Sequence, residues 1–414
     1  MLRFLTAGES HGESLVAILD GMPAGLELAR EVIDRQLGRR QLGYGRGRRM
    51  AIESDHAEIL SGVRHGLTLG TPIALRIANK DWANWQWTMA VEPEPPPSAS
   101  GAHRAAVTRP RPGHADLAGA LKYGHEDLRD VLERASARET AARVAVGACA
   151  GALLGHFGIR IVAHVTALGP VRLLDAYARS FDEVAALDVD DPARCVDAAC
   201  RERMIAAIDA ARAAGDTVGG SFEVIARGVP PGLGSYAQWD RRLDGRLAQA
   251  LMSIPAIKAV EIGEGVSAAS RPGSTVHDPI LPASDPRRPD RLTRPTNHAG
   301  GVEGGVSNGE DIRATAYMKP IPTLMSPLPS VDLATGHEAP ASVERSDTCA
   351  VPAASVVGEA VVSIVLADAF LETFGGDSLA DITRSFEAWQ RARQLRFASP
   401  TGDARQPGAA RSRR

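Results

Sequence analysis

Two long apolar segments constrain the fold more than any other feature of the sequence. Residues 138–157 are rich in Ala and Gly, carry few charges and end at Gly158. Residues 353–374 form a last long apolar segment that is stopped by Gly375 and Gly376. A helix that is apolar around most of its circumference must be covered on several sides, and a glycine commonly follows the end of a helix. Both segments therefore predict helices, and the first predicts a buried helical centre.

Strands and helices alternate around these two segments. The patterns predict strands at residues 1–7, 15–19, 72–78, 159–168, 221–226, 257–262 and 314–318, and helices at residues 27–41, 201–214 and 240–254. The chain has 414 residues, of which 44% are hydrophobic, so it can bury a large core. Because we find neither an internal repeat nor a break in composition between lobes, we predict an α+β fold in a single large domain.

Two polar segments are predicted to lie outside the core. Residues 92–100 are rich in Pro, Glu and Ser, which favours an exposed surface loop over a linker between domains. The tail at residues 400–414 is predicted to be disordered.

The overall charge and the cysteines exclude several classes of protein. A formal net charge of -3 provides no overall field that would hold the protein on nucleic acid or on an anionic membrane. The start of the chain lacks an apolar run behind basic residues, and we expect no stretch that approaches the roughly 18 apolar residues of a membrane span. The four cysteines form no metal-type C-x-x-C pair, so reduced thiols and no metal site are expected. We therefore predict a cytoplasmic protein.

Two histidine motifs are candidates for acid–base chemistry. The motif G-E-S-H-G at residues 8–12 places His11 in a turn at the end of a strand; a turn with a structurally satisfied histidine is the alternative. In R-P-R-P-G-H-A-D, at residues 109–116, a Pro-Gly turn holds His114 near Arg109 and Arg111. A histidine close to a bound anion is suited to act as a general acid. Asp116 has the alternative role of capping the following helix.

A glycine-rich loop carries clustered arginines. Residues 42–49 read L-G-Y-G-R-G-R-R and follow Arg39 and Arg40. Guanidinium groups bind carboxylate and phosphate oxygens in pairs, and the glycines favour a polyanion clamp. Solvated surface charge and an RNA-binding patch are the alternatives.

Three further motifs are ambiguous on their own. E-R-A-S-A-R-E-T at residues 133–140 predicts either a phosphate seat at a helix N-terminus or a capping box between Ser136 and Glu139. The glycine pairs of residues 296–311 allow close approach to a flat ligand, and Lys319 in K-P-I-P-T could reach a phosphate or a ring carbonyl. Neither a Walker nor a Rossmann pattern is present. In E-R-S-D-T-C, at residues 344–349, Asp347 is either a base or part of a local ion pair.

Taken in order, these motifs resemble the chorismate synthase family across residues 1–382. The resemblance rests on G-E-S-H-G, Y-G-R-G-R-R-M, S-G-V-R-H-G at residues 61–66, R-P-G-H-A-D, S-A-R-E-T, G-G-V-E-G-G and K-P-I-P-T. It implies a helical core sandwiched between antiparallel β-sheets. Residues 1–382 would form the catalytic domain, and residues 383–414 a helix end and the tail.

The resemblance also implies a reaction. Family members catalyse a 1,4-anti elimination of phosphate from 5-enolpyruvylshikimate 3-phosphate, which gives chorismate and requires reduced FMN without net redox change. Some members also oxidise NADPH as a flavin reductase. Family members are usually homotetramers in which FMN lies near a subunit interface.

Site residues carry over from the family by position. His11 would donate a proton to the departing phosphate, His114 would be a proton donor beside the flavin, and Asp347 would help to remove the ring proton. Substrate contacts are expected at Arg40, Arg46, Arg49, Arg111 and Arg138. FMN contacts are expected at Arg134, Ala135, Ser136, Ala256, Gly304, Lys319, Pro320, Ile321, Pro322, Thr323 and Arg345. Residues 85–106 and 285–294 match the family poorly and are assigned no role.

Overall fold

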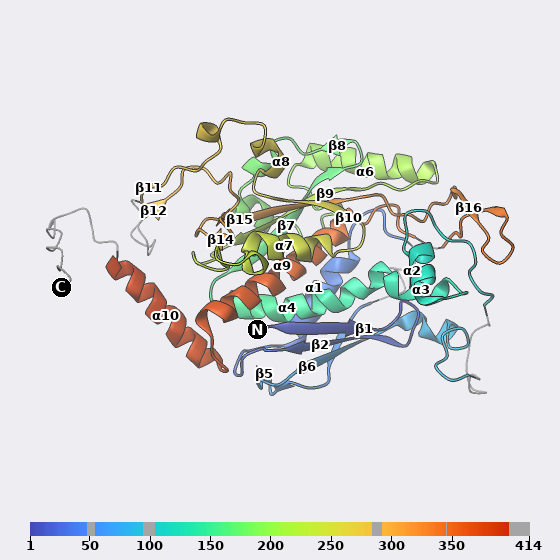
Figure 1. The fold of residues 1–414 in the computed structure, drawn as a ribbon, viewed down its shortest axis with the longest axis horizontal. Helices are drawn as coiled ribbons and strands as arrows, with labels where there is room; N and C mark the ends of the chain where they lie inside the picture. The colour runs from blue at the N-terminus through green and yellow to red at the C-terminus, as the bar shows by residue number, and fades with distance from the viewer. Residues whose placement is uncertain (48–53, 94–103, 284–291, 345, 397–414) are drawn as a thin grey trace, which may run out of the picture.

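Two antiparallel sheets enclose a layer of helices (Figure 1). The computed structural model describes residues 1–47, 54–93, 104–283, 292–344 and 346–396. One sheet has the strand order β1 (Arg3–Ala7), β2 (Ser14–Asp20), β6 (Ile73–Ala78) and β3 (Ala57–Ile59). The other has the order β10 (Ile257–Ile262), β15 (Ile312–Met318), β9 (Gly220–Arg227), β7 (Arg160–Leu168) and β8 (Val171–Arg172). The predicted α+β fold is confirmed.

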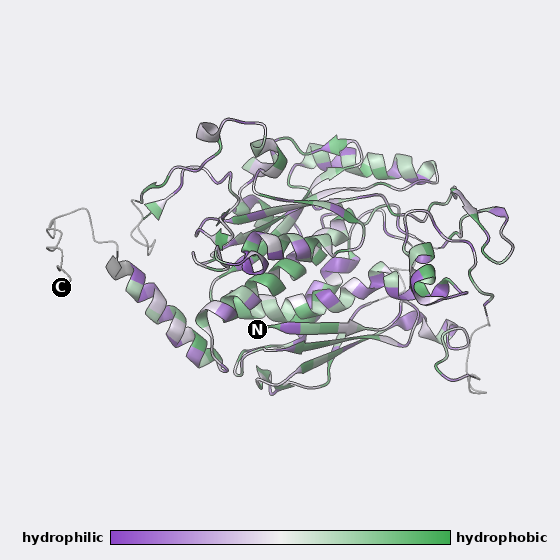
Figure 2. Cartoon of the chain, viewed as in Figure 1, coloured by the Kyte–Doolittle hydropathy of each residue, from purple (hydrophilic) through white to green (hydrophobic). Residues whose placement is uncertain are grey.

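The helical layer consists chiefly of α4 (Thr140–His156), α9 (Val351–Phe374) and α1 (Arg30–Gln41). A Cβ atom on Gly147 of α4 would lie 2.4 Å from the Cβ of Ala360, so these small residues let α4 and α9 approach closely. On the far side of α9, a Cβ on Gly358 would lie 2.5 Å from the ring of Phe222 in β9. The two helices are largely hydrophobic along their lengths (Figure 2).

Shorter elements surround this core. The remaining α-helices of the described chain are α2 (Asp116–Tyr123), α3 (Arg129–Ala135), α5 (Phe181–Ala185), α6 (Ala198–Ala213), α7 (Leu243–Met252), α8 (Gly265–Ala268) and α10 (Leu379–Arg396). Two-stranded pairs form between β4 (Val63–Arg64) and β5 (Leu67–Thr68), β11 (Leu281–Pro282) and β12 (Leu292–Thr293), β13 (Val302–Glu303) and β14 (Val306–Ser307), and β16 (Pro329–Val331) and β17 (Glu338–Pro340). Helix α10 projects from the body (Figure 1), and its Phe386 and Trp389 contact Phe374 of α9.

The predicted elements are present, with shifted boundaries. The helix predicted from residue 201 begins at Ala198, because the Asp197 side chain accepts a hydrogen bond from the Cys200 amide and caps it. The helix predicted at residues 240–254 is interrupted at Arg242, whose backbone is extended between a short 3-10 turn and α7. The proposed domain limit at residue 382 stays a prediction, and α10 spans it.

One expectation about apolar stretches was wrong. Helix α9 is long and apolar enough to cross a membrane, although we expected no such stretch. However, 89% of its most apolar window is buried inside the fold, as in the core helix of a folded domain. The four cysteines are buried and unpaired. Most of the predicted loop at residues 92–100, and the tail at residues 400–414, lie outside the described residues.

Candidate active site

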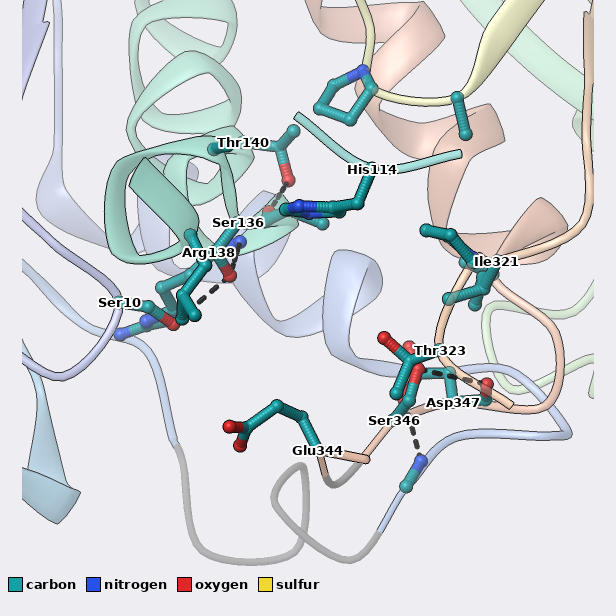
Figure 3. Close-up of a pocket in the computed structure, with 18 of the residues that line it drawn as sticks. Ser10, His114, Ser136, Arg138, Thr140, Ile321, Thr323, Glu344, Ser346 and Asp347 are labelled. Carbon is teal, nitrogen blue, oxygen red and sulfur yellow. Dashed lines mark hydrogen bonds between the residues drawn. The ribbon is translucent and has the colours of Figure 1, made fainter. Parts of the chain in front are cut away.

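A cavity of about 890 Å³ brings distant parts of the chain together beside the helical layer. Its lining residues fall within the ranges 10–11, 40–47, 81–85, 104–115, 132–140, 254–256, 318–323 and 346–357, together with Glu344. Figure 3 shows Ser10, Ser136 and Arg138 on one side of the open space, and Ile321, Thr323 and Asp347 on the other. The volume lies at the upper end of the range for ligand pockets.

Most of the site residues expected from the sequence line this cavity. They are His11, Arg40, Arg46, Arg111, His114, Ala135, Ser136, Arg138, Ala256, Lys319, Ile321, Pro322, Thr323 and Asp347. Arg134, Pro320 and Gly304 are described but do not line it. The Arg134 side chain donates to the Thr6 and Gly8 carbonyls instead. Arg49 and Arg345 lie outside the described residues.

The first wall holds His11. A Cβ on Gly8 would lie 2.4 Å from the Ser14 carbonyl, so the turn that presents His11 needs glycine there. The Glu133 carboxylate of α3 contacts His11 twice, each time at 2.7 Å. One oxygen lies against the ring Nδ1 of His11, and the other accepts a hydrogen bond from the His11 backbone amide. Because Nδ1 is occupied, a ligand in the cavity can exchange a proton only with Nε2. The indole of Trp85 stacks on the imidazole, with centroids 3.8 Å apart.

The second wall holds His114. Its Nδ1 lies 2.5 Å from Oδ1 of Asp116, whose other oxygen accepts from Nε of Arg111 at 2.8 Å. Burial alone would raise the pKa of Asp116, but hydrogen bonds from His114 and Arg111 lower this pKa well below its ordinary value. The carboxylate therefore orients both side chains. The alternative of a helix cap was wrong, because Asp116 is the first residue of α2 and its side chain points to these partners.

Two arginines of the predicted clamp, Arg40 and Arg46, line the cavity. Arg40 is buried, with 4% of its surface exposed. It forms an ion pair with the buried Asp55 at 3.3 Å, and Arg138 pairs with the same carboxylate at 2.6 Å. Burial lowers the pKa of Arg40 to about 10, with Arg46 and Arg138 lowering it further against the opposing effect of Asp55. A surface patch for solvent or RNA was therefore the wrong interpretation of Arg40. Arg39 instead forms an ion pair with Glu359 of α9, at 2.6 Å.

Asp347 ties the arginine loop to the segment before α9. Its carboxylate pairs with Nη1 of Arg46 at 2.7 Å and accepts a hydrogen bond from the Gly47 amide at 2.6 Å. A Cβ on Gly47 would lie 2.9 Å from the Ser346 carbonyl, so a larger residue would push the two segments apart. The ion pair of Asp347 therefore joins two segments that are distant in sequence and is not a local pair. The Asp347 carboxylate still lies at the cavity wall.

One wall suits a flat ligand such as a flavin. Ile254, Ala256, Ile321 and Pro322 give it an apolar surface, and Lys319 adds a cation. The Lys319 amide donates to the carbonyl of Ala256, which has a left-handed φ of 69°. That backbone is unfavourable for alanine, so the surrounding packing must enforce it. Burial and the nearby Lys258 lower the pKa of Lys319. Apolar surface beside cations fits both the ring system and the phosphate of FMN.

The segment before α4 does not form the capping box. The Ser136 hydroxyl donates to the Ser10 hydroxyl at 3.1 Å and accepts from the Arg138 amide. The Glu139 carboxylate accepts from Thr6 and from Arg143 instead of closing the box. A phosphate seat at this helix start stays a prediction.

Several residues that line the cavity or hold its side chains in place were missed from the sequence. Glu133, Asp55 and Asn79 hold the predicted histidine and arginines, and no local pattern marks them as their partners. Trp85 and Arg104 line the cavity within the stretch that was assigned no role. The tryptophan-rich sequence at residues 82–87 was the one available signal.

The cavity is electrically suited to a polyanion. Its lining contains the cations Arg40, Arg46, Arg104, Arg111, Arg138 and Lys319, against the acids Asp81, Glu344 and Asp347. Two histidines with carboxylate partners stand at its walls. The arrangement can therefore bind several carboxylate or phosphate groups and exchange protons with them.

Comparisons with known proteins agree with the resemblance. The sequence profile of the chorismate synthase family matches residues 2–371. A chorismate synthase of Moorella thermoacetica is 58% identical over 94% of this chain and 99% of its own length. One of Solibacter usitatus is 56% identical over 94% and 98%. A crystal structure of a chorismate synthase superposes with a TM-score of 0.75 at 43% identity, covering 95% of this chain and 98% of the other.

Proposed function

The chain belongs to the chorismate synthase family, and from this premise we propose how its residues carry out the family's reaction. The enzyme is a carbon–oxygen lyase of the shikimate pathway. It eliminates phosphate from 5-enolpyruvylshikimate 3-phosphate and forms chorismate. One C–H bond and one C–O bond break, a ring double bond forms, and a proton and phosphate leave. The observation that carries the proposal is the cation-rich cavity with one carboxylate-held histidine on each of two walls.

The family uses reduced flavin, and we propose that reduced FMN lies on the apolar wall of this cavity. The chemistry that a flavin bound there would supply is a transient donation of electron density to the substrate, without net redox change. Ala135, Ser136, Ala256, Ile321, Pro322 and Thr323 would hold it, with Lys319 as a cationic partner. Gly304 lies in the β13–β14 turn away from the cavity lining, so its predicted flavin contact requires a second subunit of the proposed homotetramer. Contacts from Arg134, Pro320 and Arg345 stay predictions.

The arginines bind the substrate. Two carboxylates and one phosphate need several cations, and Arg40, Arg46, Arg111 and Arg138 supply them at the cavity wall. Arg49 is proposed to join them. Because Asp55 and Asp116 already fix Arg40, Arg138 and Arg111, little side-chain freedom is lost when the substrate binds.

The acidic and basic groups move protons. His11, held at Nδ1 by Glu133, would donate the proton on Nε2 to the departing phosphate oxygen. His114, held at Nδ1 by Asp116, would serve as a proton donor beside the flavin. Asp347 would assist removal of the ring proton, with its carboxylate kept in place by Gly47 and Arg46.

Anaerobic phosphate release tests this proposal. Purified protein, chemically reduced FMN and 5-enolpyruvylshikimate 3-phosphate should release phosphate and chorismate in equal amounts. Oxidised FMN is the matched control and should support no release. Absence of release with reduced FMN, or equal release with both forms, would contradict the proposal.

The source of reduced flavin is a separate proposal. NADPH is proposed as a reductant, as in some family members, and oxidation of NADPH in air with added FMN measures it directly. Turnover without substrate would support an intrinsic reductase, and no turnover would leave an external reductant as the source.

We also propose a cytoplasmic enzyme, for which the burial of α9 inside the fold is the support.

A further inference from the structure

We infer that Trp85 is a positioning residue that holds the imidazole of His11 in its proton-donating orientation. The inference rests on the proposed role of His11 as the acid for the leaving phosphate. It gives a function to the stretch of chain that the sequence left without one.

Two contacts together determine how the imidazole lies. The contact to Glu133 at 2.7 Å places Nδ1, but a single hydrogen bond leaves the ring free to rotate about that axis. The Trp85 indole is stacked on the ring with an interplanar angle of 18° and a centroid distance of 3.8 Å, and this contact sets the plane of the ring. Together they fix the direction in which Nε2 points.

Trp85 is itself held in place, as a positioning residue must be. It is 6% exposed, and its indole Nε1 donates to Oδ2 of Asp81 at 3.0 Å. The guanidinium carbon of Arg104 lies 3.8 Å from the centroid of the indole. These contacts come from neighbours on both sides along the chain, so the indole is a rigid platform.

Asn79, which precedes this stretch in the sequence, holds the backbone on either side of His11. The side-chain amide of Asn79 donates to the carbonyls of Glu9 and Gly12, at 3.2 and 2.7 Å. Asn79 therefore fixes the turn and Trp85 fixes the ring. Proton transfer depends steeply on the position of the donor, since a displacement of about 1 Å can cost about a hundredfold in rate.

The test compares Trp85→Phe with Trp85→Leu in the reduced-FMN phosphate-release assay. Both replacements keep an apolar side chain, but only Phe can stack on His11. We expect Trp85→Leu to lower kcat about tenfold with KM changed less than about twofold, and Trp85→Phe to stay within about threefold of the unchanged enzyme. Trp87→Leu is the matched control, since Trp87 is 38% exposed and lies outside the cavity lining; it should leave kcat unchanged.

A double-mutant cycle separates positioning from other roles of Trp85. If Trp85 acts through His11, Trp85→Leu should lower kcat by less than about twofold in the His11→Ala background. An equal loss in both backgrounds would overturn the inference, as would an unchanged kcat or a change in KM alone. Thermal unfolding of each variant identifies a general folding defect, and Trp85→Phe then still reports on stacking. Failure of the unchanged enzyme to release phosphate would count against the proposed function instead.

Discussion

The two histidine walls of the cavity share one arrangement, a carboxylate beside the imidazole, but differ in the charges around that carboxylate. In both, a carboxylate holds Nδ1 and leaves Nε2 for chemistry. Within the described residues, the Glu133 carboxylate makes its hydrogen bonds to His11, whereas Asp116 divides its bonds between His114 and Arg111. The charge of Glu133 is therefore available to His11, while Arg111 neutralises the charge beside His114. With the proposed roles, this difference suits His11 to a place beside the highly charged leaving group, and it links His114 through Asp116 to Arg111, a proposed substrate ligand.

Removal of either imidazole should have the largest effect. His11→Ala and His114→Ala should each lower kcat by about a hundredfold or more, because each removes a proton donor. The two walls should differ in a second measurement: binding of FMN should weaken in His114→Ala and stay unchanged in His11→Ala. Fluorescence titration of oxidised FMN provides that measurement. Near-normal rates in both variants would remove the assigned roles, and equal FMN affinities would remove the difference between the walls.

Neutralising either carboxylate should lower the rate less than removing a histidine, and the two variants should differ in their effect on KM. Glu133→Gln keeps an oxygen near Nδ1 but loses the charge, so kcat should fall about tenfold with KM nearly unchanged. Asp116→Asn also releases Arg111, so KM should rise together with a fall in kcat. Steady-state kinetics under anaerobic conditions would measure both parameters. The same pattern in the two variants would argue that Arg111 is not coupled to the His114 wall.

The acid stability of the protein should show the smallest effect. Because the pKa of Asp116 is lowered in the folded protein, this carboxylate stabilises the fold above its unfolded pKa of about 4. That contribution is lost as the pH falls from there toward the folded pKa. The midpoint of urea unfolding should therefore decrease more steeply below about pH 4 in the unchanged protein than in Asp116→Asn. Parallel curves would show that Asp116 contributes nothing to acid stability.

Local patterns predicted the framework and the reactive groups, but not the groups that hold them. The composition of residues 138–157 predicts a buried helix, because a high content of Ala and Gly and a low number of charges can be read from the local sequence. His11, His114 and Arg40 stand out because glycine and proline motifs bracket them or arginines cluster around them. Glu133 lies 122 residues from His11 along the chain, and its pairing depends on the placement of α3.

The same limit applies to Asp55 and to Gly304. Asp55 becomes a partner of Arg138 only after the first sheet packs against α4, across 83 residues of sequence. Gly304 shares a motif with the family, but a motif does not state whether the same chain or a second subunit completes the site. Pairings across the fold are set by packing, and packing is not a local property.

A crystal structure with oxidised FMN and 5-enolpyruvylshikimate 3-phosphate would test the central claim most directly, since the oxidised flavin should not support turnover. We predict a phosphate oxygen of the substrate within about 3.2 Å of Nε2 of His11, and the flavin ring against His114 and residues 319–323. A phosphate bound away from His11, or a flavin outside this cavity, would contradict the assignment of the two walls.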